Sequence, residues 1–402
     1  MKKLLLAVVA LMLVLPNLYA QDAPTAEPYK ASQTQFMVRG YAHAGLNYQK
    51  VGDEAESSFV GTTFNPLFIF KHGDRLLFES ELEFAFEDGQ LEIGFEYANM
   101  SYLLNDYMTI RMGKMLLPFG TFIERLHPSW INKFANAPLG FGHGGISPAS
   151  GIGVELRGAI PVGSMKVTYS GYVTNGPRLN SGLDADGNPD EPDEAGQLIF
   201  NNFEDNNGKK GYGGRLAILP LSNSSLEIGG SVYGGAVGNA DDPLYSGTGA
   251  MLYAVDLSFV RQVSAVKGII DIKGQYNLTN VDEATYFEPE DDGLGNITLE
   301  EYTFENSSSA YFGQISYRPS MAGNDVVKNF ELAYRYSAFN APEGAEWEQE
   351  SKQWSVALNY YVNWRTLLKL SYQSTNQAGG HGVAEGESIQ TDGLFVHWAL
   401  GF

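Results

Sequence analysis

The stretch FESELEFAFE, from Phe78 to Glu87, alternates between apolar and acidic side chains with a period of two. Its even positions are aromatic or aliphatic except for Ser80, and four of its five odd positions are glutamates (Glu79, Glu81, Glu83 and Glu87). Successive side chains of a β-strand point to opposite faces, so this strand carries carboxylates on one face only. Carboxylates without partners cannot be buried in an apolar core, and this face therefore meets water.

The same alternation continues along the chain from Gln35 onward, in segments of about ten residues separated by turn residues. That length is typical of strands in an outer-membrane β-barrel. We predict sixteen strands, at residues 36–49, 58–71, 75–87, 90–103, 107–116, 151–160, 164–175, 210–219, 225–237, 249–261, 267–280, 308–318, 326–338, 351–362, 365–376 and 389–402.

The connections between these strands alternate in length. Short turns such as KHGD, LNDY and PVGS alternate with a second set that is mostly long: 50–57, 117–150, 176–209, 238–248, 281–307, 339–350 and 377–388, with only EDGQ short. Membrane barrels have short periplasmic turns on one rim and long external loops on the other. The pattern predicts a closed antiparallel barrel with long external loops.

The two faces of the predicted strands have opposite character. In the segment 326–338, the apolar set is Phe330, Leu332, Tyr334 and Tyr336, and the polar set is Asn329, Glu331, Arg335 and Ser337. A soluble barrel has an apolar interior, whereas a membrane barrel has lipid outside and water inside. Alternation alone does not distinguish the two. The aromatic content of 13%, the strand number and the N-terminal signal favour the membrane barrel over a soluble all-β protein.

The N-terminal residues read as a secretory signal peptide. Residues 1–20 contain two lysines, a short apolar core from Leu4 to Leu15 and a small residue, Ala20, at the predicted cleavage site. The apolar core is short for a membrane anchor, which is the alternative. We predict a signal peptide at 1–20, a short polar lead at 21–34 and the barrel at 35–402. The net charge of −21 makes nucleic acid an improbable partner.

Charged residues on the inward face are segregated. The acids gather on the segments 75–87 and 90–103, while the bases are spread over the remaining wall. This segregation predicts an electric field across the pore and a mild preference for cations. The predicted pore-lining residues are Glu79, Glu81, Glu83, Glu87, Glu92, Glu96, Arg39, Arg111 and Arg157.

The long connection 117–150 combines charged side chains with many aromatic ones. Its candidate constriction residues are Glu124, Arg125, His127 and Lys133. We predict that this loop folds into the barrel and narrows it, with Arg125 and Lys133 facing the acids of the third and fourth strands and a short helix in HPSWINKF. The alternative is a compact external loop packed by its own aromatic side chains.

A second acidic segment, DADGNPDEPDE, begins at Asp184. Together with Asn188, the residues Asp184, Asp186 and Asp190 have the every-second-residue spacing of calcium loops, but Pro189 stands where such a loop needs glycine. The three aspartates are weak calcium candidates, and a solvated acidic loop tip is the alternative. The sequence contains no motif for a catalytic nucleophile, a phosphate loop or zinc, so we expect no catalysis and no cofactor.

Two segments resemble a known class of membrane protein. The terminal FVHWALGF, with Phe402 last, resembles the final strand of Gram-negative outer-membrane proteins, which implies recognition by the barrel-assembly machinery. Residues 111–158 resemble porins of the phosphate-selective O/P-like group. That resemblance implies a third external loop folded into the barrel and a homotrimer. Phosphate-selective members use a ladder of lumen arginines and lysines, whereas the bases here are interrupted by acids.

The expected function is therefore passive diffusion of small hydrophilic solutes or ions through an outer-membrane porin. The alternative is a structural or adhesive barrel that does not conduct, with acidic loops that bind a partner or calcium. The expected surroundings in either case are outer-membrane lipid and lipopolysaccharide.

Overall fold

The computed structural model describes residues 34–87, 90–142, 144–184, 187–201, 203–291, 297–380, 383 and 386–402. The predicted signal peptide and nearly all of the polar lead lie outside these residues. No helix of the described part of the chain is long and apolar enough to cross a membrane.

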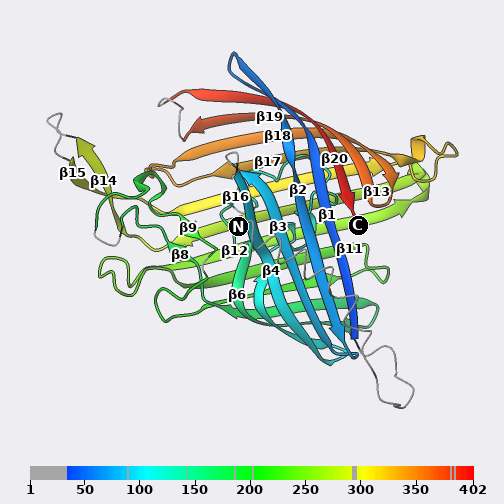
Figure 1. Ribbon diagram of the computed structural model, residues 1–402, viewed down its shortest axis with the longest axis horizontal. Coiled ribbons are helices and arrows are strands. Elements are labelled where there is room, and N and C mark those ends of the chain that lie inside the picture. The colour runs from blue at the N-terminus through cyan, green and yellow to red at the C-terminus, as the bar shows by residue number, and fades with distance from the viewer. Residues whose placement is uncertain are drawn as a thin grey trace, which may run out of the picture.

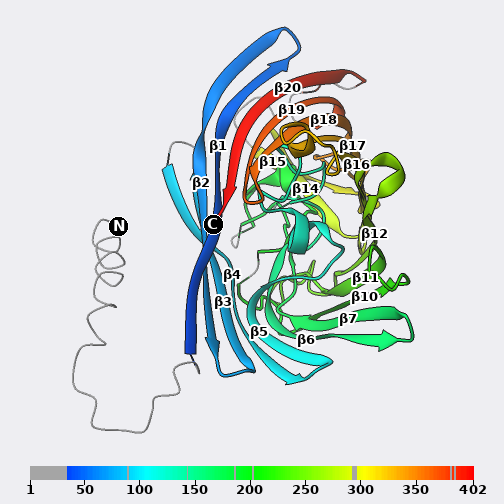
Figure 2. The same ribbon diagram turned by 90° about the vertical axis from the view of Figure 1, so that its right-hand side faces the viewer.

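Sixteen strands form one closed antiparallel barrel, as predicted (Figures 1 and 2). They are β1 (Thr34–Val51), β2 (Glu54–His72), β3 (Leu76–Glu87), β4 (Gln90–Asn105), β5 (Met108–Leu116), β6 (Ser150–Val162), β7 (Met165–Thr174), β10 (Gly211–Leu219), β11 (Leu226–Ala236), β12 (Gly249–Val263), β13 (Gly268–Val281), β16 (Ser307–Arg318), β17 (Phe330–Asn340), β18 (Gln349–Asn363), β19 (Thr366–Gly379) and β20 (Ser388–Gly401). Each pairs with the next around the ring, and β20 pairs with β1 to close it.

The closure places the end of the chain beside its beginning. The backbone of Phe402 exchanges two hydrogen bonds with Gly40 of β1. The Phe402 ring stacks on Phe64 of β2, with the ring centroids 5.8 Å apart. Trp398 and Leu400 are exposed, as expected for an outward apolar face at the end of β20. The final strand therefore has the alternation that the sequence predicts.

The faces of the strands are reversed relative to a soluble protein. On β17, Leu332 is 56% exposed and Tyr334 45% exposed, whereas Glu331 is 4% exposed and Arg335 is completely buried. On β3, Phe78 and Phe86 are exposed while Glu81 is 2% exposed. The apolar side chains point away from the barrel and the polar ones toward its interior. This is the arrangement that a lipid solvent selects.

Several connections differ from the predicted ones. The connection expected at 50–57 is a tight turn at Gly52 and Asp53, because the alternation of β1 and β2 continues to that point. Two loops carry strands of their own: β8 (Arg178–Leu179) with β9 (Leu198–Ile199), and β14 (Thr285–Asp291) with β15 (Ile297–Thr303). The β14–β15 hairpin projects from one end of the barrel (Figure 1).

Short helices occupy four connections: η2 (Phe122–Leu126), η3 (Pro192–Glu194), η4 (Ser264–Val266) and η5 (Val327–Asn329). The helix expected within HPSWINKF is instead η2, which ends before it, and a turn follows in which Ile131 and Asn132 donate to the Pro128 carbonyl. Packed apolar side chains gather around this loop and under the other loops of the same rim rather than in a central core.

Candidate functional site: the loop inside the barrel

The connection between β5 and β6, which we call L3 (residues 117–149), folds into the barrel, as predicted (Figure 2). Its entry and exit are joined by a hydrogen bond from the Leu117 amide to the Ala149 carbonyl. Phe122 is buried against Phe141 and against Phe312 of β16, with edge-to-face rings. The aromatic residues of L3 therefore pack on the inner wall.

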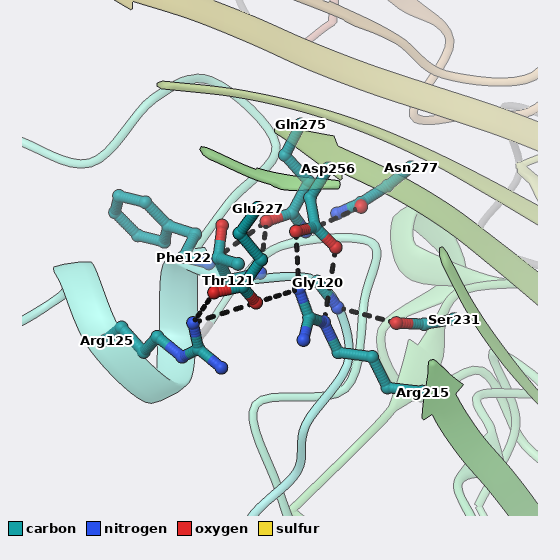
Figure 3. Close-up of polar contacts among 10 residues, drawn as sticks. All are labelled: Gly120, Thr121, Phe122, Arg125, Arg215, Glu227, Ser231, Asp256, Gln275 and Asn277. Carbon is teal, nitrogen blue, oxygen red and sulfur yellow. Dashed lines mark hydrogen bonds and ion pairs between the residues drawn. The ribbon is translucent and has the colours of Figure 1, made fainter. Parts of the chain in front are cut away.

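The start of L3 is bound to the wall through its backbone (Figure 3). Gly120 donates its amide to Oγ of Ser231 on β11 at 3.0 Å. The amides of Thr121 and Phe122 both donate to Oε1 of Gln275 on β13, at 2.8 and 3.0 Å. These amides lie just before and at the first residue of η2, where backbone N–H groups have no partner within the helix, so the two wall side chains satisfy them.

Arg125 extends an ion-pair network on β10, β11 and β12. Its Nη1 lies 2.9 Å from Oε2 of Glu227, which also binds Arg215 at 2.9 Å. Arg215 in turn contacts Asp256 at 2.5 Å. Figure 3 shows these four side chains joined in one chain of contacts. The positive charge of Arg125 is therefore compensated by the wall that it touches.

Glu124 turns to a different part of the wall. It accepts a hydrogen bond from Nη1 of Arg157 on β6 at 2.6 Å and lies 3.9 Å from Arg111 of β5. Burial by itself raises the pKa of this carboxyl, but the neighbouring arginines outweigh burial and hold the pKa below its usual value. Glu124 is therefore ionised at neutral pH. Arg111 also contacts Glu155 at 2.5 Å.

His127 brings L3 to the acidic strands. Its Nε2 lies 3.7 Å from Oε1 of Glu96 on β4 and 3.5 Å from the Tyr41 hydroxyl on β1. Tyr41 donates that hydroxyl to Glu81 of β3 at 2.6 Å. Tyr41 is not among the residues predicted to line the pore, because aromatic side chains of membrane strands are typical of the outward face. Tyr41 comes two residues after Arg39 and so shares its inward face, and this position is the signal in the sequence that could have identified it.

Lys133 contradicts the predicted charge arrangement. It binds Glu331 of β17 and, at 2.8 Å, Asp271 of β13, and it donates to Ser316 of β16. Neither Lys133 nor Arg125 faces the glutamates of β3 and β4, so that prediction was wrong. After η2, L3 continues across the interior of the barrel. Arg125 and Lys133 therefore form ion pairs with carboxylates of the parts of the wall that L3 contacts.

The predicted pore-lining residues occupy four environments. Glu81 and Glu96 are buried, Glu81 beside Tyr41 of the wall and Glu96 beside His127 of L3, while Glu79 and Glu83 are partly exposed on the interior side of β3. Glu92 and Arg39 are exposed. Arg111 and Arg157 are in ion pairs with glutamates, and the side chain of Glu87 lies outside the described residues.

Open space remains beside L3. A cavity of about 340 Å³ has Glu124, Arg125, Pro118, Arg157 and Arg215 in its wall. A second cavity, of about 350 Å³, lies between residues 144–146 of L3 and the segment that includes β9. Charged groups of L3 and of the wall thus meet water-accessible space inside the barrel.

The candidate calcium residues are only partly described. Asp184 accepts hydrogen bonds from the amide and side chain of Asn188, an arrangement that closes a local turn. Asp186 lies outside the described residues. Among the described residues, no three His, Cys, Asp or Glu side chains are grouped as metal ligands would be. Calcium binding by this loop stays a prediction.

Comparison with known proteins gives structural likeness only. No family model matches the sequence, and no curated protein matches it. Among solved structures, the outer-membrane channel DcaP of Acinetobacter baumannii covers 94% of this chain and all of its own, with 12% identity and a TM-score of 0.55.

Two further structures are similar over most of their length. OmpF of Salmonella typhi, solved with daunomycin, covers 92% of this chain and 98% of its own at 12% identity, with a TM-score of 0.52. The anion-selective porin of Comamonas acidovorans covers 92% of this chain and all of its own at 11% identity, with a TM-score of 0.51. At these identities the likeness is one of fold, and the fold is that of outer-membrane barrels.

Proposed function

We propose that this protein is an outer-membrane porin through which small hydrophilic solutes or ions diffuse passively. The observation that carries the proposal is the reversed barrel, with apolar side chains outside, polar ones inside and L3 folded into the interior. Its N-terminal signal peptide directs export, and lipid and lipopolysaccharide surround it. The protein is not an enzyme, and its assembly as a homotrimer belongs to this proposal.

The charge pattern supports weak selectivity. Arg111, Arg157 and Arg215 are each in contact with a carboxylate, so their charges are largely compensated. The acidic residues Glu79 and Glu83 are partly exposed on the interior side of β3. Cations are therefore mildly favoured. The resemblance to the phosphate-selective O/P-like group concerns the barrel, and we do not extend it to phosphate selectivity.

The test is electrical recording from the purified full-length protein in planar lipid bilayers. We expect discrete conductance steps in potassium chloride and a reversal potential that indicates slight cation preference in a salt gradient. A protein that inserts into the bilayer with its heat-resistant folded mobility intact but never conducts would overturn the proposal.

L3 contacts several parts of the wall, and this favours considering the alternative of a structural barrel that L3 closes. A variant with a shortened L3 distinguishes this alternative from a conducting porin. Replacing residues 120–146 with a short glycine-serine linker removes every ion pair made by L3. If L3 narrows a conducting pore, this variant conducts several times more than the natural protein. If L3 closes a structural barrel, only the variant conducts.

A further inference from the structure

The middle of L3 rests on a part of the wall where the charges do not balance. Arg335 of β17 is completely buried there, and Lys369 of β19 is 3% exposed. Within the described residues, the ion pairs of this region join Lys133 and Lys273 to two carboxylates, Asp271 and Glu331, and none of them includes Arg335 or Lys369. Four cations therefore share two carboxylates.

Lys369 has hydrogen-bond partners but no opposite charge. Its ammonium group donates to the carbonyl of Ser129, to that of Asn132 at 2.6 Å and to that of Phe134 at 3.2 Å. An ammonium group has three N–H donors, and these three carbonyls use all of them. Carbonyl dipoles solvate the charge without neutralising it.

Part of the Arg335 guanidinium has no hydrogen-bond acceptor in the described structure. Nη2 donates to the carbonyls of Asn136 and Ala137, at 3.0 and 3.2 Å, and the group stacks over the Phe134 ring at 4.4 Å. Its Nε and Nη1 atoms are buried and have no hydrogen-bond partner in the described structure. Three of the five N–H groups of this arginine therefore point at no acceptor.

Such an arrangement is costly as it stands. A buried charge without a counter-charge is strongly destabilising, and each buried donor without an acceptor adds an uncompensated loss of hydration. The wall beside Arg335 contains small side chains. Ala333 of β17 and Ala357 of β18 are buried there, and Phe134 of L3 packs on them. Ser371 pairs with Ala357 across the strands, and its hydroxyl is likewise buried without a partner.

We propose that this region holds a small monovalent anion of the halide class, chloride under natural conditions, bound between L3 and the β17–β19 wall. Nε and Nη1 of Arg335 donate to it, and Lys369 contributes charge. A halide fits better than phosphate or sulfate, because it loses less hydration free energy on entering a site closed to water. The anion fastens residues 129–137 of L3 to the wall, whether or not the barrel conducts.

Diffraction from crystals of the full-length protein grown in sodium bromide tests the site directly. We expect an anomalous bromide peak within hydrogen-bonding distance of Nε and Nη1 of Arg335. Ordered water at that position without an anomalous signal, or bromide bound only at the protein surface, would overturn the proposal.

Stability in different anions gives a second test. Because a ligand that binds only the folded state stabilises it, the unfolding temperature should rise with chloride when gluconate is exchanged for chloride at constant ionic strength. Arg335→Gln should remove this rise. The matched control is Arg318→Gln, since Arg318 also donates to a backbone carbonyl and stacks on an aromatic ring, Tyr361, but is not fully buried.

The control variant should keep the full response to chloride. Equal responses in Arg335→Gln and the natural protein would place the anion effect elsewhere and overturn the assignment. If Arg335→Gln does not fold, the bromide peak of the natural protein decides the question.

Discussion

Glu124 and Arg125 are adjacent in sequence, yet their side chains are held by different walls of the barrel. Glu124 binds Arg157 of β6, and Arg125 binds Glu227 of β11. The period of two predicts that Arg157 faces inward, and it places Glu227 on the inward face of β11 in the same way, so the location of both wall residues is predictable. Which L3 residue each one binds was not, because that depends on where the loop crosses the interior and not on any local pattern.

The lowered pKa of Glu124 predicts how the attachment of L3 to the wall depends on pH. A carboxyl whose pKa is lower in the folded than in the unfolded state stabilises the protein at pH values above its unfolded pKa of about 4.3. That stability is lost as the pH falls through the folded pKa. L3 should therefore stay protected from protease at pH 7 and 5 and lose protection only in stronger acid. Loss of protection already between pH 7 and 5 would contradict this.

Glu124→Gln should weaken the same contact at neutral pH. We expect a loss of about 1–3 kcal/mol in the free energy of unfolding, less than for a fully buried pair because Arg157 is partly exposed. Urea unfolding in lipid vesicles measures it. The control is Asp325→Asn, which alters an exposed ion pair with Lys328 in a turn and should cost little. Equal losses in the two variants would mean that burial of Glu124 has no energetic consequence.

The acidic wall predicts the sign of selectivity. Changing both Glu79 and Glu83 to Gln should move the reversal potential toward anions while leaving the fold intact, because both side chains are partly exposed on the interior side of β3. Glu81 is left unchanged, since it is buried and bonded to Tyr41. Glu301→Gln, on the projecting hairpin, is the control. An unchanged potential in the double variant would mean that ions do not pass this wall.

At the scale of elements, the strands were predictable because a period of two is a local property that survives over ten residues. Register was less predictable. The pairing of β1 with β2 shifts between His43 and Gly45, so that Phe59 pairs with the outward Leu46 and is 84% exposed, while Val60 pairs with Gly45. Alternation continued back from Phe64, Phe68 and Phe70 of the same strand would place Val60 outward. A bulge shifts every later side chain, and no local signal marked it.

The last strand is the element whose end closes the barrel. Deleting Phe402 removes its stacking on Phe64 and its two backbone hydrogen bonds with Gly40, so we expect slower insertion and unfolded protein in the periplasm. The measurement is the fraction with heat-modifiable mobility after a pulse of synthesis. Phe203→Ser, which changes an exposed loop aromatic, should insert normally. Normal insertion without Phe402 would show that the terminal aromatic residue is dispensable for closure.

At the scale of the whole molecule, the barrel sorts its connections by length, which predicts its orientation in the membrane. The long connections, including L3 and the β14–β15 hairpin, emerge at one rim, and turns such as Gly163–Ser164 at the other. The sequence identified this sorting, because loop length is read directly from the spacing of strands. The strands within two of the loops escaped detection, because strands of only 2 or 7 residues leave little periodic signal.

Chemical labelling of intact cells tests the orientation, and the absence of cysteine from the chain makes single-cysteine variants clean reporters. Asp241→Cys is placed in an exposed position of the connection between β11 and β12, and Ser164→Cys in the tight turn between β6 and β7. Membrane barrels keep long loops outside the cell and short turns in the periplasm. A membrane-impermeant maleimide should therefore label Asp241→Cys on intact cells, and Ser164→Cys only after the outer membrane is disrupted. The reverse pattern would place the acidic loops and the entrance above L3 in the periplasm.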